Sequence, residues 1–167
     1  STFAARVTAS TGAPISAAVL AGLAALSGPL HGNASQSMAG LVEETRRRGA
    51  EVAVAAHLRQ GQTLVCFGHR LYPEGDVRAP ALLEAFALPQ PFAELARAGE
   101  ALSGERPNVD FALAAMTTAF NWPEDPPLQI FALARSVGWI AHALEQVETG
   151  ALIRPRARYT GPAPMIS

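Results

Sequence analysis

Two histidines and one aspartate of this sequence lie beside turn-forming residues, where a side chain can reach a bound substrate. His31 lies in the run Gly28-Pro29-Leu30-His31-Gly32, and His69 follows Gly68, which permits close approach of a ligand. Asp110 stands at the expected start of a helix. Each also has a purely structural interpretation, because histidines often cap helices and first-turn acidic residues often accept hydrogen bonds from exposed N–H groups.

Two arginines are candidates for holding an anionic substrate. Arg78 follows Asp76 by two residues, and Asp76 is either a turn residue or a partner that orients Arg78. Arg135 lies between the apolar residues 131–134 and 137–139, where an arginine requires an anion or a buried carboxylate. The arginine run at 46–48 suits the negative end of a helix dipole better than a phosphate site.

Two histidines, one aspartate and several arginines supply what carbon–carbon bond formation from a thioester requires. A base removes the α-proton, and a hydrogen-bond donor at the thioester oxygen stabilises the resulting enol or enolate. A second donor acts on the electrophilic carbonyl, and arginines hold the carboxylates of a dicarboxylate electrophile. Spacing alone does not select this assembly over other combinations of the same residues.

The elements that must position these residues are predicted to be helices, because helical spacing of apolar residues recurs along most of the chain. Helices are expected near 2–9, 14–26, 35–48, 50–59, 79–87, 91–103, 107–119 and 128–147. Pro107 is expected to open the helix that carries Asp110. The segment 63–67 is expected to be extended or a loop. The sequence therefore predicts an all-α fold with one or two short extended pieces.

Composition narrows the class of protein. Apolar residues make up 49% of the chain and charged residues 16%, which is typical of a globular core and not of a disordered segment. The net charge of −1 supplies no long-range attraction to nucleic acid or an anionic membrane. The single Cys66 forms no internal disulfide, zinc-ligand spacing is missing, and the most apolar run, 17–26, is about half a membrane span. We therefore expect a cytoplasmic protein with no metal site and no nucleic-acid or membrane partner.

Six motifs in order resemble the citrate synthase family, which includes 2-methylcitrate synthases. The motifs are residues 1–6, 28–32, 67–72 with Asp76 and Arg78, 108–111, 131–135 with Gly138, Trp139 and His142, and 152–159. They span nearly the whole chain. The resemblance implies a citrate-synthase-like multi-helical fold in which a small domain is inserted between parts of a large one. Residues 1–30 and 116–167 would belong to the large domain, and 31–115 to the small, CoA-binding lid.

The resemblance also implies a role for each candidate residue. His31 would donate a hydrogen bond to the thioester carbonyl, Asp110 would remove the α-proton, and His69 would donate to the 2-oxo carbonyl. The implied substrate-binding residues are Arg78, Arg135, Arg154, Phe131 and Asn108. The implied CoA-binding segment is Leu64, Val65, Cys66, Phe67 and Gly68. Arg154 would reach the active site of the other subunit, which implies a homodimer.

The implied activity is that of an acyltransferase of the tricarboxylic acid cycle, in which the acyl group becomes an alkyl group on transfer. Acetyl-CoA, or propionyl-CoA, condenses with oxaloacetate through an enol or enolate, and the thioester is then hydrolysed. The CoA thioester is a substrate, and no cofactor is permanently bound. Family members are longer, so we expect this chain to be an incomplete piece that is inactive alone. The alternative is a non-catalytic, citrate-synthase-like module that binds a carboxylate or CoA in a regulatory role.

Overall fold

The computed structural model describes residues 1–28, 31, 34–123 and 126–162. This part of the chain contains eight helices: α1 (Thr2–Ser10), α2 (Ile15–Leu26), α3 (Ala34–Arg48), α4 (Ala50–Arg59), α5 (Arg78–Leu83), α6 (Gln90–Ser103), α7 (Val109–Ala119) and α8 (Pro126–Thr149). Within the same residues there is no strand, and an isolated antiparallel bridge joins Phe67 to Pro107. The predicted all-α class is therefore confirmed.

The chain forms two compact units, and the division falls within α8. The first unit comprises Ser1–Ala25 and Arg135–Ser167, and the second comprises Leu26–Ala134. The domain limits of 1–30, 31–115 and 116–167, which the family resemblance implies, stay a prediction. No helix in the described ranges has both the length and the apolar character needed to cross a membrane.

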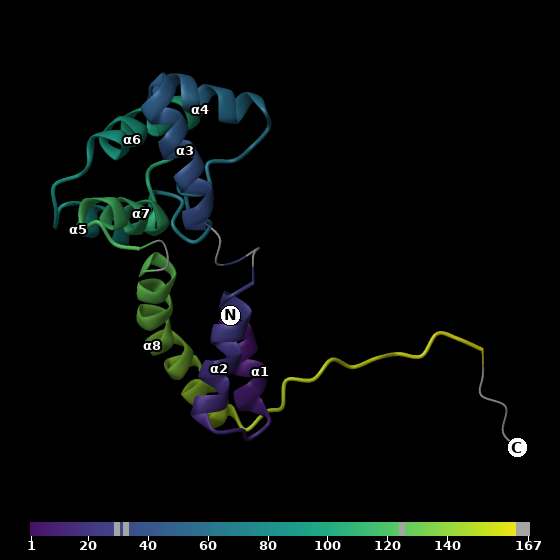
Figure 1. Ribbon diagram of the computed structural model, residues 1–167. Helices are drawn as coiled ribbons and strands as arrows, with labels where there is room; N and C mark the ends of the chain where they lie inside the picture. The colour runs from purple at the N-terminus through teal and green to yellow at the C-terminus, as the bar shows by residue number, and fades with distance from the viewer. Residues whose placement is uncertain (29–30, 32–33, 124–125, 163–167) are drawn as a thin grey trace, which may run out of the picture. The chain divides into compact units, whose positions relative to one another are not determined.

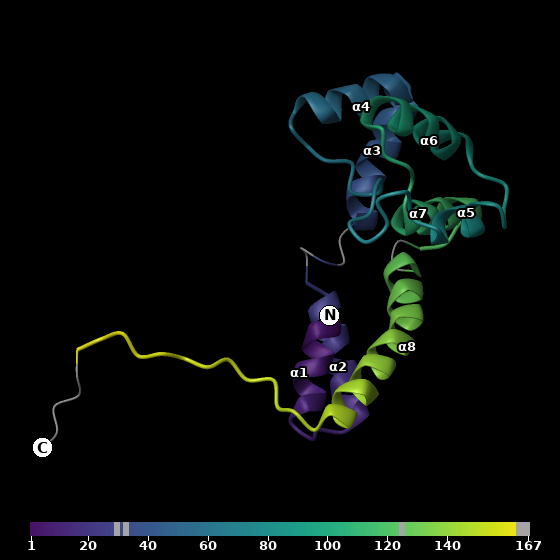
Figure 2. The same ribbon diagram turned by 180° about the vertical axis from the view of Figure 1, so that it is seen from behind.

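In the first unit, α1, α2 and the C-terminal part of α8 lie side by side (Figure 1), as the reverse view also shows (Figure 2). A glycine permits the approach of α2 to α8. A Cβ atom at Gly22 would lie 2.7 Å from Cδ2 of the Trp139 ring, which is buried. Only a residue without a side chain therefore fits at this contact without displacing the ring.

Polar contacts attach α1 to α8 and to the segment that follows it. The Arg6 side chain donates from Nε to Oε1 of Gln146 at 3.1 Å and forms an ion pair with Glu145. The Ile153 backbone N–H donates to Oγ of Ser10 at 3.0 Å. These bonds fix the start of the otherwise irregular segment that carries the predicted site residue at position 154.

In the second unit, α3 packs against α4, α6 and α7, while α4 packs against α6 and α5 against α7. Three aromatic rings meet edge to face in its core. The ring centroids of Phe67 and Phe111 are 5.3 Å apart, and those of Phe92 and Phe111 are 5.5 Å apart. Because Phe111 belongs to α7, this cluster fixes the helix that carries Asp110.

The expected helix at 79–87 is wrong in its C-terminal half, since α5 ends at Leu83. Residues 84–89 form turns and irregular chain instead. Phe86 lies in this stretch, packs against the core and has its ring centroid 5.7 Å from that of Phe120. Tertiary packing of this aromatic side chain outweighs the helix propensity of the neighbouring alanines and leucines.

Candidate active site

A cavity of about 220 Å³ in the second unit is the place where most of the predicted site residues meet. Four ionisable side chains line it: His31, His69, Arg78 and Asp110. The remaining lining is apolar: Leu26, Val109, Leu113, Pro127, Leu128 and Phe131. The structure thus brings together the three predicted catalytic residues and two of the predicted substrate-binding ones. They come from well-separated parts of the sequence, so the fold of this unit builds the site.

Asp110 owes its position to a capped helix start. The side-chain Oδ1 of Asn108 accepts from the backbone N–H groups of Asp110, at 3.0 Å, and Phe111, at 3.3 Å. This bonding makes Asn108 the N-cap of α7 and places Asp110 in the first turn. The prediction that Pro107 opens this helix is wrong, because α7 begins at Val109 and Pro107 pairs with Phe67 in the isolated bridge.

The other end of the Asn108 side chain holds the loop at 64–68. Its Nδ2 donates to the backbone oxygens of Val65, at 3.1 Å, and Gly68, at 3.0 Å. Asn108 is itself buried. Its amide group therefore joins the start of α7 to the predicted CoA segment. The substrate contact predicted for this residue stays a prediction.

Most side chains of the predicted CoA segment point into the core. Leu64, Cys66 and Phe67 are buried, whereas the side chain of Val65 is 47% exposed. Of these side chains, Val65 is therefore the one that is exposed for contact with a ligand. Burial, with a smaller effect of the Asp110 charge, raises the pKa of the Cys66 thiol, so the thiol stays protonated near neutral pH.

The backbone determines which nitrogen of His69 can donate. The Leu71 N–H donates to Nδ1 of His69 at 3.1 Å. A ring nitrogen that accepts a hydrogen bond carries no proton, so the neutral ring carries its proton on Nε2. The ring also packs against Tyr72, with the centroids 4.8 Å apart. His69 is therefore held as an Nε2–H donor.

Arg78 is held by the fully buried side chain of Asp76. Nε and Nη2 of the guanidinium donate to the two carboxylate oxygens, each at 2.8 Å, and the Arg78 backbone N–H donates to Oδ1 at 3.1 Å. Both interpretations of Asp76 therefore hold, because it shapes the turn and orients the arginine. The guanidinium also lies 5.4 Å from the centroid of the Tyr72 ring.

Each member of this ion pair stabilises the charged form of the other. The hydrogen bonds that Arg78 donates to Asp76 raise the pKa of Arg78, so the guanidinium is charged at all accessible pH values. Burial by itself raises the pKa of Asp76, but hydrogen bonds from Arg78 and from the Val109 N–H outweigh it. The pKa of Asp76 therefore lies below its usual value, and the carboxylate is ionised.

The pKa of Asp110 is shifted in the opposite direction from that of Asp76. Burial raises its pKa above the usual aspartate value, and the negative charge of Asp76 adds to the rise. The charges of Arg78, His69 and His31 oppose it without cancelling it. A carboxylate with a raised pKa is a stronger base than one at the surface. The cavity therefore combines one strengthened base with one fixed guanidinium and two imidazoles.

Arg135 and Arg154 are not among the residues that line this cavity. Both belong to the first unit, where Nη2 of Arg135 donates to Oγ1 of Thr2 and Arg154 is exposed in the irregular segment after α8. Their predicted substrate contacts stay predictions. In the predicted motif at 28–32, Pro29, Leu30 and Gly32 lie outside the described residues.

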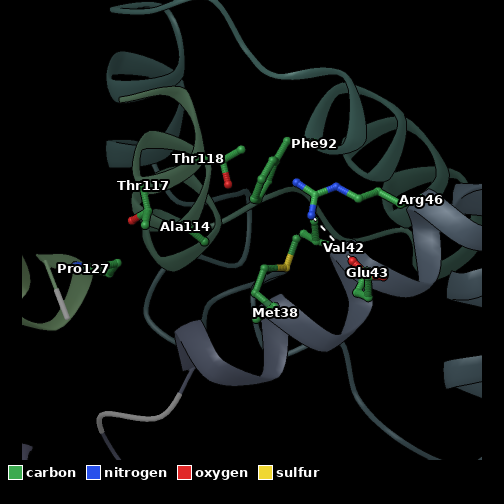
Figure 3. A pocket seen from close by; sticks show the side chains of 10 residues that line it. Met38, Val42, Glu43, Arg46, Phe92, Ala114, Thr117, Thr118 and Pro127 are labelled. Carbon is green, nitrogen blue, oxygen red and sulfur yellow. Dashed lines mark ion pairs between the residues drawn. The ribbon is translucent and has the colours of Figure 1, made fainter. Parts of the chain in front are cut away.

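A larger cavity, of about 420 Å³, lies between α3, α6 and α7 (Figure 3). Its walls are mainly apolar, and its charged pair, Glu43 and Arg46, is joined at 3.6 Å. Its described lining contains no histidine or aspartate, and none of the predicted site residues lines it. Nor do the described residues include three or more His, Cys, Asp or Glu placed to hold a metal ion. The smaller cavity is therefore the candidate active site.

Sequence reasoning missed three contacts at this site. Tyr72 touches both His69 and Arg78, and the Val109 N–H donates to Oδ2 of Asp76 at 2.9 Å across 33 positions of sequence. Tyr72 belongs to one of the six motifs, so its place in the sequence gave a signal without indicating its contacts. The bond from Val109 has no local signal at all.

Residues 1–156 match the family model of the citrate synthase C-terminal domain. Citrate synthase 2 of Bacillus subtilis is 37% identical over 97% of this chain and 46% of its own length. The 2-methylcitrate synthase 1 of Corynebacterium glutamicum is 33% identical over 96% of this chain and 45% of its own length.

A solved structure is also similar. The citrate synthase of Thermoplasma acidophilum, in a ternary complex with carboxymethyl coenzyme A and oxaloacetate, aligns with a TM-score of 0.75 and 30% sequence identity. The alignment covers 99% of this chain and 49% of that one. This chain therefore spans about half the length of the relatives it matches.

Proposed function

Because the chain belongs to the citrate synthase family, we propose that the protein containing it condenses an acyl-CoA with oxaloacetate. The observation that carries this proposal is the meeting of Asp110 with His31, His69 and Arg78 in one cavity. The complex of a similar protein with carboxymethyl coenzyme A and oxaloacetate supports this pair of ligands. The cavity supplies a base, two imidazoles and a cation, which are the groups that the reaction requires.

In the first step, Asp110 takes a proton from the α-carbon of the acyl-CoA. The electron pair of the broken C–H bond forms the carbon–carbon double bond of an enol or enolate, and negative charge moves to the thioester oxygen. His31 donates a hydrogen bond to that oxygen, which stabilises the charge where it develops. The raised pKa of Asp110 lowers the barrier to this transfer, because the α-proton is only weakly acidic.

In the second step, the α-carbon of the enolate attacks the 2-oxo carbon of oxaloacetate. A carbon–carbon bond forms, the C=C bond of the enolate is lost and the thioester C=O bond is restored. The π bond of the 2-oxo carbonyl breaks, its electron pair moves to the oxygen, and this oxygen takes up one proton to become a hydroxyl group, which balances the proton removed by Asp110. His69 donates to this oxygen through Nε2–H, and the Leu71 N–H on Nδ1 favours that tautomer. Water then hydrolyses the thioester, and the CoA thiol and the carboxylic acid product are released.

Arginines hold the electrophile during both steps. Asp76 uses two of the five N–H donors of Arg78, which leaves three for a carboxylate of oxaloacetate. Arg135, and Arg154 from the partner subunit of a homodimer, complete the binding of the dicarboxylate in this proposal, with Phe131 packed beside it. The loop at 64–68 borders the CoA, with Val65 as its exposed side chain. The cytoplasmic location expected from the sequence belongs to the same proposal.

Acetyl-CoA and propionyl-CoA are both candidate donors, since similar proteins include citrate and 2-methylcitrate synthases. The two substrates differ by one methylene group, which changes discrimination by ~1–3 kcal/mol. The ratio of kcat/KM for the two thioesters therefore identifies the preferred acyl group.

The test of the proposed function is the release of CoA thiol by the full-length protein, with each thioester and with oxaloacetate present or absent. We expect turnover that requires oxaloacetate. A folded protein that binds both ligands and releases no CoA would instead be the non-catalytic binding module.

A further inference from the structure

One buried carboxylate contacts two walls of the candidate active site. Oδ1 of Asp76 accepts from Nε of Arg78, while Oδ2 accepts both from Nη2 of Arg78 and from the Val109 backbone N–H. Arg78 and Val109 both line the cavity, and Asp110 directly follows Val109 in α7. The group that orients the arginine therefore also binds the first N–H of the helix that carries the base.

We propose that Asp76 is a positioning residue that couples the oxaloacetate-binding arginine to the helix bearing the base. This inference rests on the proposed function. Both bonds depend on the ionised carboxylate, because its two oxygens are acceptors only and have no proton to oppose the guanidinium or the backbone N–H. Its complete burial excludes water as a substitute partner. A shift of the Arg78 guanidinium on binding a carboxylate is thereby transmitted to the start of α7.

Two side chains, those of Asn108 and Asp76, accept hydrogen bonds from the N–H groups at the start of α7. Asn108 binds the N–H groups of Asp110 and Phe111, and Asp76 binds that of Val109. The three bonds use the first three N–H groups of the helix, which have no partner within the helix. Asn108 joins this helix start to the loop at 64–68, whereas Asp76 joins it to the substrate arginine.

Two substitutions separate the two contacts of Asp76. In Asp76→Asn, the amide has one acceptor oxygen and presents an NH₂ group to either the guanidinium or the Val109 N–H. The substitution therefore weakens the contact with Arg78 and the contact with Val109. Val109→Pro deletes the N–H and leaves the contact of Asp76 with Arg78 in place, but it also changes the side chain. Proline suits this position, because Val109 is the first residue of α7 and Asn108 before it has extended backbone. Val109→Ala keeps the N–H and serves as the control for lost packing.

In steady-state kinetics of the full-length protein, Asp76→Asn should raise the KM for oxaloacetate about 10-fold or more and lower kcat. Val109→Pro should lower kcat about 3- to 10-fold and leave the KM for oxaloacetate within about twofold. Val109→Ala should lower kcat less than Val109→Pro does. Equal effects of Val109→Pro and Val109→Ala, or an unchanged KM in Asp76→Asn, would overturn the proposal.

The pH dependence of kcat/KM distinguishes the proposed coupling from a general loss of structure. Asp110 faces the charges of Asp76, Arg78, His69 and His31, and the negative charge of Asp76 raises its pKa. Asp76→Asn should therefore move the acid limb of kcat/KM to lower pH, while the exposed control Glu74→Gln leaves it in place. An acid limb that moves up, or moves equally in both variants, contradicts the coupling.

Failure of the proposed function would look different. If the folded wild-type protein has no turnover, the proposed function is wrong. The hydrogen bond between the Asp76 carboxylate and the Val109 N–H is then tested by equilibrium unfolding. Asp76→Asn and Val109→Pro delete the same hydrogen bond, so the double variant should be less destabilised than the two single effects combined. Additive effects would show that Asp76 does not hold α7.

Discussion

Gly99→Ala places a methyl group against an aromatic ring of the core. Gly99 is buried in α6, and a Cβ atom there would lie 2.3 Å from Cε1 and Cζ of Phe67. Carbon atoms in contact are normally ~3.5–4.0 Å apart, so the ring must retreat by roughly 1 Å or more. Phe67 is buried and packs edge to face on Phe111 at 5.3 Å, which opposes that movement.

The expected change in stability is the balance of two effects. Overpacking a core costs ~1–3 kcal/mol, while replacing glycine by alanine inside a helix contributes ~1 kcal/mol in the other direction. The short contact with a confined ring indicates the upper part of the first range. We therefore expect Gly99→Ala to destabilise the protein by about 1–2 kcal/mol.

Gly40→Ala is the matched control, because it makes the same substitution within a helix, in α3. No atom lies within 4 Å of a Cβ at Gly40, so only the helix-propensity effect remains. This variant should gain about 0.5–1 kcal/mol. The assay is urea unfolding of the full-length protein, in which the midpoint changes and the m-value stays constant. If Gly99→Ala stabilises as much as Gly40→Ala does, the packing described around Phe67 is wrong.

Three further predictions concern the site. The kcat/KM of the wild type should fall as pH falls through the raised pKa of Asp110, because the base must be ionised; an acid limb at or below ~3.9 contradicts this. Asn108→Ala should lower the free energy of unfolding by about 2 kcal/mol in urea titrations, since it removes a helix cap and two buried loop bonds; a loss under ~0.5 kcal/mol contradicts this. Tyr72→Leu should raise the KM for oxaloacetate about threefold, and Tyr72→Phe should not, because the phenyl ring preserves the contact with Arg78. Equal KM values for the two Tyr72 variants would exclude a role for the ring.

The helices were largely predictable because their signals are local. Residues 50–59 were expected as a helix, and α4 has these bounds, with Gly49 before it. The start of α7 was less clear, since Pro107 and Asn108 are both common near helix starts. The long-range bridge to Phe67 holds Pro107 outside the helix and leaves Asn108 as the cap. A contact so distant in sequence has no local pattern.

The sequence was sufficient to predict which residues form the site, but not the hydrogen bonds and contacts that orient them. His31, His69 and Asp110 were expected from motifs, and the cavity brings them together. The contacts that orient them cross long stretches of sequence, such as the bond between Asp76 and Val109. Spacing along the chain reports local geometry only, so these bonds required the folded structure.

The measurement that tests the assignment of Asp110 most directly is kcat for CoA release by the full-length protein, wild type against Asp110→Asn. Binding of oxaloacetate to both proteins, measured by calorimetry, shows that the site remains folded. We expect kcat to fall about 10²- to 10⁴-fold, the usual contribution of a general base, while oxaloacetate affinity changes only a few-fold. An Asp110→Asn variant that turns over as fast as the wild type would show that another group removes the proton.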